Sequence, residues 1–194
     1  MKKKRFLLLL TIFFLPFPGT AQPSGSMTAC PHGACFDGQK EVEGQRLPLR
    51  GTGLLQYLKL DIYSGAFYAP EHVDTPEEAL ADVPKSLILQ YHRGIKVKWM
   101  QQASERILKK NPAVDLQALK PRLDLIAGAY QKVEKGDRYE LRYAPGKGTT
   151  LLLNDREVIQ VPGEDFARAY LGIWLSEKPA NARFRDSLLG RRAA

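Results

Sequence analysis

The order in which strand and helix patterns follow one another constrains the fold of this chain more than any single motif. Alternating apolar and polar residues predict strands, and apolar residues three or four positions apart predict helices. Strand patterns lie at 42–49, 54–68, 86–91, 137–143, 149–153 and 158–161, and helix patterns at 75–82, 96–110, 116–130, 162–174 and 181–189.

The last three strand patterns follow one another with no helix between them. Asn154-Asp155 separates the final two and favours a hairpin turn. Residues 54–68 are interpreted as one long strand, with Leu58 and Leu60 on one side. This order lacks the strict alternation of a parallel doubly wound fold. We therefore predict an α+β fold, with a curved antiparallel sheet and helices layered on one face.

The N-terminus has the three parts of a secretory signal peptide. Four cations at positions 2–5 precede an apolar run over 6–17 and the small residues Gly19-Thr20-Ala21. The run is shorter than the roughly 20 residues that span a bilayer. We expect residues 1–21 to be cleaved, leaving an exported protein, periplasmic or secreted, with no stable membrane span. Cleavage lowers the net charge from +8 to +4, so the basicity is weak support for nucleic-acid binding and we expect none.

The only two cysteines lie close together in the predicted arm over 22–37. Cys30 and Cys35 enclose Pro31 and Gly33, which favour a turn, and an oxidising compartment favours a disulfide between them. Covalent haem attachment normally uses cysteines two residues apart followed by His, and a closed zinc site needs a further ligand beside His32. We predict a disulfide loop and no metal site, followed by one domain over 38–190 and a basic tail over 191–194.

Several polar side chains at predicted strand ends are candidates for ligand binding. Arg50 and Arg93 could each hold a carboxylate or phenolate, or form surface salt bridges. His92 follows a strand and could bind haem or a metal, or lie half in solvent. The many aromatic residues on strands and helices could fill a solid core or leave an apolar cleft between sheet and helices.

Several segments together resemble the chalcone isomerase-like family, in the form found in exported bacterial proteins. Their order and spacing carry the resemblance across nearly the whole of residues 40–190. The matching segments are 49–54 leading into 59–68, 91–95, 135–137, 144–150, 159–166, 173–175 and 178–179. The resemblance implies an antiparallel sheet with helices layered on it and a ligand cleft between them.

The resemblance also implies which residues would carry an isomerase reaction. Plant chalcone isomerases close a ring by an intramolecular Michael addition, and an arginine two residues after a Gly-x-Gly holds the attacking phenolate. Here the Gly-x-Gly is Gly51-Thr52-Gly53, and Leu55 occupies the arginine position. The threonine of the plant strand maps onto Tyr63, and the helix positions of the plant Tyr and Asn fall near Lys96 and Ala103. A leucine cannot pair with a phenolate.

The leucine at this position indicates a non-catalytic protein, and the resemblance implies a ligand class, because related non-catalytic members bind fatty acids. We therefore expect the chain to bind an apolar or amphipathic small molecule, such as a fatty acid, in an apolar cleft. Arg93 and Tyr63 would hold a carboxylate. The expected ligand-binding residues are Arg50, Leu55, Tyr63, Arg93, Lys96 and Trp99.

Three alternatives stay open. One is an isomerase acting on an unknown substrate, with Tyr63 working beside Lys96 or Arg93. Another is a haem protein with His92 as axial ligand, although we expect no cofactor. The third is an interaction protein that uses Arg191 and Arg192 of the tail.

Overall fold

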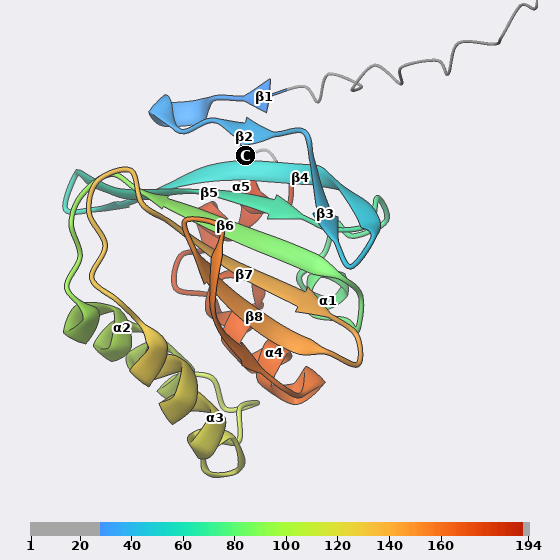
Figure 1. Cartoon of the computed structure of the whole chain (residues 1–194), viewed down its shortest axis with the longest axis vertical. Coiled ribbons are helices and arrows are strands. Elements are labelled where there is room, and N and C mark those ends of the chain that lie inside the picture. Colours follow the sequence, from blue (N-terminus) through green and yellow to red (C-terminus); the bar gives the residue numbers. More distant parts are fainter. Residues whose placement is uncertain (1–27, 192–194) are drawn as a thin grey trace, which may run out of the picture.

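The computed structural model describes residues 28–191, and the predicted signal peptide lies outside these residues, as do positions 22–27 of the arm and 192–194 of the tail. Within 28–191, seven strands form one antiparallel sheet in the order β3-β4-β5-β6-β7-β8-β9, and the short β1 and β2 pair separately (Figure 1). The strands are β1 (Thr28–Ala29), β2 (Phe36–Asp37), β3 (Gln39–Val42), β4 (Gln45–Tyr57), β5 (Leu60–Tyr68), β6 (Lys85–Tyr91), β7 (Arg138–Ala144), β8 (Gly148–Leu153) and β9 (Arg156–Val161).

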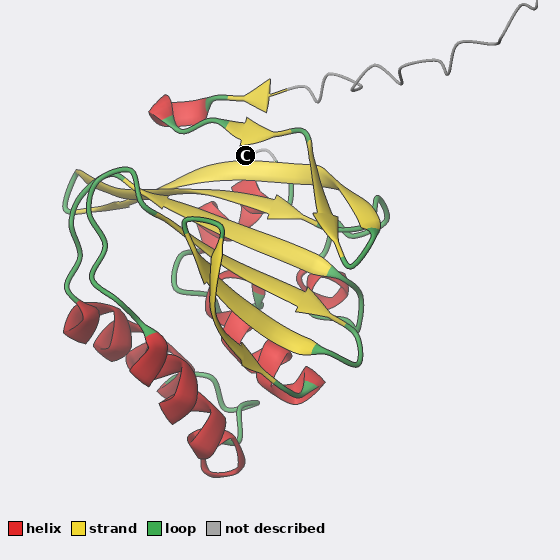
Figure 2. Cartoon of the chain, viewed as in Figure 1, coloured by secondary structure: helices red, strands yellow, loops and turns green. Residues whose placement is uncertain are grey.

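The helices cover one face and one flank of this curved sheet (Figure 2). They are a 3-10 turn at Pro31–Gly33, α1 (Pro76–Ala79), α2 (Val97–Lys109), α3 (Leu116–Ala129), α4 (Glu164–Leu175) and α5 (Ala182–Leu188). α5 packs on β4, and α4 packs on β8. α2 lies against α4, and α3 lies beside α2 and against β9. The predicted α+β class, with an antiparallel sheet and helices on one face, is confirmed. Among residues 28–191, no helix is both long and apolar enough to cross a membrane.

The interpretation of residues 54–68 as one strand is wrong. A two-residue turn at Leu58 and Lys59 separates β4 from β5, and both residues adopt left-handed backbone, with φ of 49° and 63°. Such turns usually use Asn or Gly, because other side chains crowd the backbone there. The sequence offers neither residue, and the alternating pattern runs through the turn without a break, so the turn left no local signal.

Three glycines on β4 and β5 provide the surface on which α5 lies. A Cβ added to Gly51 would stand 2.1 Å from the carbonyl oxygen of Ser187 in α5, and one on Gly65 would stand 2.5 Å from the Phe184 ring. Gly53 also lies under Phe184. The Gly-x-Gly is therefore part of a strand with a bulge between Leu49 and Gly51, and it lets a helix approach the sheet closely.

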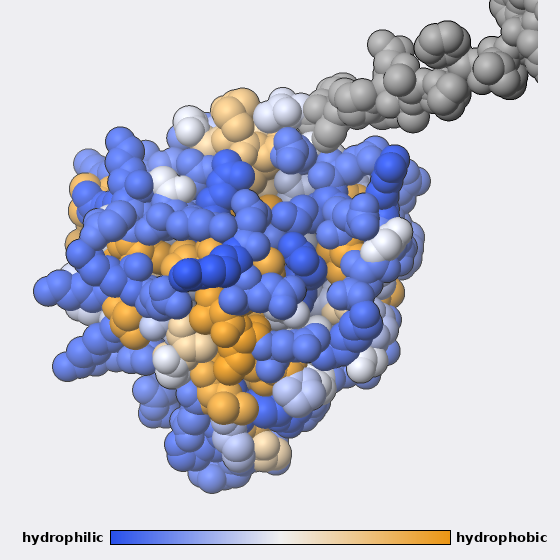
Figure 3. Space-filling view, viewed as in Figure 1, coloured by the Kyte–Doolittle hydropathy of each residue, from blue (hydrophilic) through white to orange (hydrophobic). Residues whose placement is uncertain are grey.

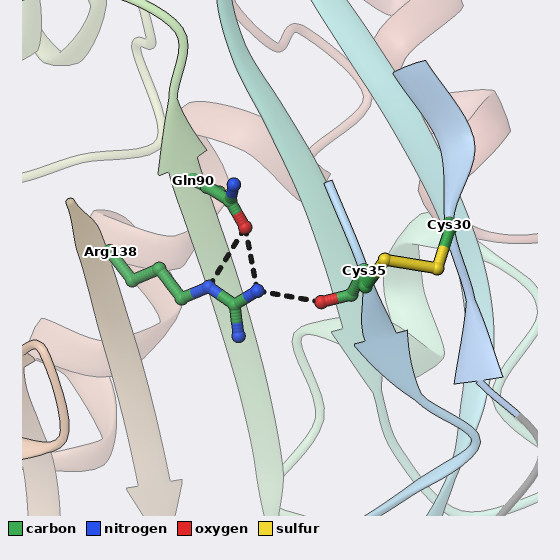
Figure 4. The surroundings of a disulfide bond; sticks show 4 residues. All are labelled: Cys30, Cys35, Gln90 and Arg138. Atoms are coloured by element: carbon green, nitrogen blue, oxygen red, sulfur yellow. Dashed lines mark hydrogen bonds between the residues drawn. A yellow bond between two sulfur atoms is a disulfide. The ribbon is translucent and has the colours of Figure 1, made fainter. Parts of the chain in front are cut away.

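The sheet's opposite face has a smaller apolar cluster under the N-terminal arm. Phe36 is buried there, and the predicted disulfide between Cys30 and Cys35 is present. Arg138 on β7 donates from Nη2 to the carbonyl oxygen of Cys35 at 2.7 Å and also to Gln90 on β6 (Figure 4). These bonds fasten the disulfide loop to the central strands.

A buried carboxylate lies on this same face. Glu140 accepts hydrogen bonds from Ser86, Lys40 and Arg142, each at 2.9 Å. Burial alone would raise the pKa of Glu140, but the bonds from Arg142 and Lys40 outweigh it and hold the pKa below its usual range. The group is a satisfied structural ion cluster that joins β3 to β6 and β7.

Candidate functional site

Leu55 and Tyr63 lie opposite each other in the β4–β5 pair, at the position where the resemblance implies an active site. Tyr63 is buried, and its hydroxyl accepts a hydrogen bond of 2.9 Å from Nε1 of Trp174 on α4. Its ring makes edge contacts with Tyr91 and Phe184. Burial raises the pKa of Tyr63, and the bond from Trp174 offsets this only in part, so the phenol stays neutral. This position is a packed part of the core.

The other four predicted ligand-binding residues lie elsewhere. Arg50 donates from Nε to the carbonyl oxygen of Val73 at 3.1 Å, which fastens the loop after β5. Arg93 and Lys96 are exposed in the loop before α2, and Trp99, in the first turn of α2, is 67% exposed. The structure therefore brings together Leu55 and Tyr63 but does not gather the six residues around one cavity.

His92, the predicted haem ligand of one alternative, is half-buried at the end of β6. Its Nε2 lies 2.8 Å from Oγ of Ser64, which is buried on β5. Residues 28–191 contain no cluster of three or more His, Cys, Asp or Glu side chains suited to a metal ion.

A cavity of about 300 Å³ lies between α2 and α3 and reaches Tyr170 on α4. It combines a buried apolar inner end with an exposed polar rim. The lining residues are Gln101, Ser104, Glu105, Leu108, Lys109, Leu116, Gln117, Lys120, Leu123, Asp124, Ile126, Ala127, Tyr130 and Tyr170.

The inner end of the cavity is apolar except for hydroxyls that satisfy one another. Leu108 and Ile126 are buried there, and the hydroxyls of Tyr130 and Tyr170 lie 2.8 Å apart in a hydrogen bond. Ser104 also lines this part of the cavity, and its side chain partly offsets the raised pKa of Tyr170. Burial raises the pKa of Tyr170 to about 12 and that of Tyr130 well above its usual value. The inner end is therefore uncharged and can contact an apolar group without leaving a polar atom unpaired.

The rim carries two exposed ion pairs, one on each helix. Lys109 lies 2.6 Å from Glu105 on α2, and Lys120 lies 2.8 Å from Asp124 on α3. Exposed pairs four residues apart contribute only about 0.3–0.5 kcal/mol. Either lysine can therefore turn to a ligand's carboxylate at little cost.

The Tyr130–Tyr170 pair belongs to a closed ring of aromatic side chains. Consecutive members touch through edge contacts or hydrogen bonds in the order Tyr63, Tyr91, Tyr139, Tyr130, Tyr170 and Trp174, and Trp174 returns to Tyr63. Tyr91 donates to Sδ of Met100 at 3.7 Å, a weak acceptor. The ring connects the cavity's inner end to the Tyr63 position and stiffens the packing between them.

Sequence reasoning identified these tyrosines as candidates for a core or cleft but missed the cavity residues of α2 and α3. Their apolar spacing predicted two amphipathic helices correctly. It could not show that the helices pair with each other beside the sheet, where Gln101 of α2 donates to the carbonyl of Ala127 on α3 at 2.8 Å. The cavity depends on that pairing.

Comparison with known proteins identifies a family whose sequence pattern this chain matches and a solved structure with a similar fold. The chalcone isomerase-like family matches residues 30–190. A fatty-acid binding protein from Arabidopsis thaliana has a similar solved structure, with a TM-score of 0.61 and 20% sequence identity over 84% of this chain and 95% of that chain. At that identity the likeness shows a shared fold. A search of curated proteins found no match.

Proposed function

The chain belongs to the chalcone isomerase-like family, and from this membership we propose that it is a non-catalytic, exported protein that binds a fatty acid or a similar amphipathic carboxylate. The observation that carries the proposal is the cavity between α2 and α3, with its neutral inner end and lysine rim.

The Tyr63 position lacks the electrostatic element that the isomerase reaction needs. Leu55 stands where the resemblance implies a phenolate-binding arginine. Burial is the main cause of the raised pKa of Tyr63, and its hydroxyl already accepts a bond from Trp174. Stabilising a developing oxyanion requires donors or cations aimed at it in advance. This supports a binding role over an isomerase role.

The cavity suits a ligand with an apolar tail and an anionic head. Its volume lies at the lower end of the roughly 300–1,000 Å³ typical of ligand pockets. The tail would lie against Leu108 and Ile126 and end at the paired hydroxyls of Tyr130 and Tyr170. The carboxylate would remain at the rim with Lys109 or Lys120, where a charge keeps its contact with water. The similar structure named for fatty-acid binding supports the same ligand class.

Titration of the purified protein with octanoate, dodecanoate and palmitate tests the proposal, using calorimetry and native mass spectrometry. We expect Ala127→Phe, which fills the cavity, to abolish binding, and Ala118→Phe, on the exposed side of α3, to leave it unchanged. Binding by Ala127→Phe with wild-type affinity would place the ligand elsewhere. Failure of all three fatty acids to bind would reject this ligand class.

The lysine rim has its own test. Replacing Lys109 and Lys120 together with Met should weaken dodecanoate binding by up to about tenfold and leave dodecanol binding unchanged. Lys110→Met is the matched control, because Lys110 is exposed outside the cavity. An equal loss of affinity for dodecanoate and dodecanol would show that the lysines do not bind the carboxylate.

The alternatives predict different results with the same protein. Turnover of a chalcone above the uncatalysed rate would overturn the non-catalytic assignment. A Soret band that disappears in His92→Ala would favour haem, although the cavity lining contains no His, Cys or Met to serve as axial ligand. Export is tested by fractionating producing cells and sequencing the N-terminus, which we expect to begin at Gln22.

A further inference from the structure

The turn between β4 and β5 exposes three large apolar side chains on four consecutive residues. Tyr57 is 67% exposed, Leu58 is 78% exposed and Leu60 is 45% exposed, with Lys59 between the two leucines. We call residues 57–60 the hairpin tip. It projects at the upper left of Figure 1, and Figure 3 shows hydrophobic surface at that edge of the molecule. Contiguous exposed apolar side chains commonly mark a contact surface.

The conformation of the hairpin tip makes this exposure notable. Leu58 and Lys59 both adopt left-handed backbone, a geometry that Asn or Gly accepts at lower cost. A turn needed only to join two strands would be more stable with those residues. Leu58 therefore holds an apolar side chain in water and a crowded backbone at once. The pairing of β4 with β5 fixes the backbone at this position, but it does not bury the Leu58 side chain.

A second exposed aromatic residue and several cations lie at the same end of the sheet. His92 N donates to the carbonyl of Ile62, which joins the end of β6 to the start of β5, and a bridge between Ile95 and Val133 joins the two loops there. Trp99 follows in the first turn of α2. We call the hairpin tip together with residues 92–99 and 131–137 the loop end.

The exposed charges of the loop end are mainly positive. Among the described residues, no ion pair holds the five basic side chains Lys59, Arg93, Lys96, Lys98 and Lys135. The acidic groups nearby are already engaged: Asp61 with Gln56, Glu134 with Lys132, and Asp137 with Asn154. The loop end therefore presents unpaired cations around apolar and aromatic side chains.

We propose that the loop end docks on a membrane surface that contains anionic lipids, with the hairpin tip inserted among the headgroups. Trp and Tyr favour the interface between water and hydrocarbon, and leucine adds apolar area to bury. Lysine and arginine near an anionic bilayer are each attracted to it. An acidic protein would account for the cations but leaves the cluster of Tyr57, Leu58 and Leu60 without a role. This inference rests on the loop end and not on the ligand proposed for the cavity.

The two tryptophans give a direct test with the full-length protein. Trp174 is buried and Trp99 is exposed, so quenching by brominated lipids reports the depth of Trp99. We expect quenching with vesicles of equal parts phosphatidylglycerol and phosphatidylcholine, little with phosphatidylcholine alone, and loss of the signal in Trp99→Phe. Because residues 1–27 are identical in all variants, a difference in quenching between two variants arises from the substituted residue.

Leu58→Asp and Leu125→Asp form the matched pair of variants. Leu125 is an exposed leucine on α3, outside the loop end. We expect Leu58→Asp to raise the lipid concentration needed for half-maximal Trp99 quenching at least about tenfold. Leu125→Asp should leave this concentration unchanged. Circular dichroism and thermal unfolding of both variants confirm that they fold.

Equal quenching in both aspartate variants would overturn the proposal, as would quenching that does not weaken between about 0.05 M and about 0.5 M salt. So would a wild-type dimer that becomes monomeric in Leu58→Asp while Trp99 stays unquenched by anionic vesicles. That last result would make the loop end an interface between copies of the chain.

Discussion

Replacing Gly51 with Ala should separate α5 from the sheet and thereby show what the Gly-x-Gly does. The added Cβ would stand 2.1 Å from the carbonyl oxygen of Ser187, 2.7 Å from the amide nitrogen of Gly190 and 2.8 Å from the carbonyl oxygen of Leu188. All three are backbone atoms and cannot rotate away. Ordinary van der Waals contact begins near 3.4 Å, so α5 itself must move.

The size of the effect follows from what α5 buries. Phe184 and Leu188 are buried by their contact with the sheet, and burial of such a side chain is worth about 1.5–3 kcal/mol. Overpacking by one methyl group usually costs about 1–3 kcal/mol. The obstructing atoms belong to the backbone, and α5 cannot move away without exposing Phe184 and Leu188. We therefore expect Gly51→Ala to lower the free energy of unfolding by about 3 kcal/mol.

Urea unfolding followed by circular dichroism measures this loss, and Gly128→Ala is the matched control. Gly128 lies in α3, where an added Cβ meets no atom within 4 Å, so alanine should stabilise the helix by up to about 1 kcal/mol. The two substitutions are chemically the same and should have opposite signs. A Gly51→Ala protein within about 0.5 kcal/mol of wild type would refute the assignment of the Gly-x-Gly to α5 packing.

Three further changes test other parts of the fold. Burial lowers the pKa of Lys85 to about 8, so above that pH the folded chain has released a proton that the unfolded chain retains up to about pH 10.4. Stability measured by urea unfolding should therefore rise from pH 8 to about 9.5 by on the order of 1 kcal/mol, and a Lys85→Met protein that keeps the same rise would exclude this cause. Tyr63→Phe leaves the buried indole N–H of Trp174 without its acceptor and should cost about 1–3 kcal/mol by the same measurement; an unchanged stability would mean that the hydrogen bond contributes nothing. Cys35→Ser opens the disulfide loop, while the backbone carbonyl of residue 35 still accepts from Arg138. Amide hydrogen exchange should therefore become faster in residues 28–37 and stay unchanged in β4–β8. Faster exchange throughout the sheet would contradict a local role for the disulfide.

Several features of the fold are local and were predicted from the sequence. The turn at Asn154 and Asp155 is present as expected, and a helix begins within the predicted range 75–82, where Thr75 and Glu78 form a capping box. Neighbouring residues alone satisfy the hydrogen bonds or backbone angles that both features need. The antiparallel class followed from the order of the patterns, since strands without intervening helices can pair only by short turns. The disulfide followed from two nearby cysteines.

The sequence predicted which kind of residue would gather in the core, but it did not predict where the cavity lies. The sequence showed that tyrosines on strands and helices would meet in the core, but the same spacing is compatible with a solid core or a cleft. Leu108 and Ile126 line a cavity because α2 and α3 pair with each other beside the sheet, and no periodicity encodes the space left between two helices.

Periodicity determined which face of each element is apolar, whereas tertiary packing decided which faces meet and how closely. The turn at Leu58 shows the limit: a residue that the alternating pattern assigned to a strand stands in left-handed backbone because β4 and β5 must pair at that register. Local preferences amount to about 1 kcal/mol per residue, and the burial gained by pairing whole strands exceeds them.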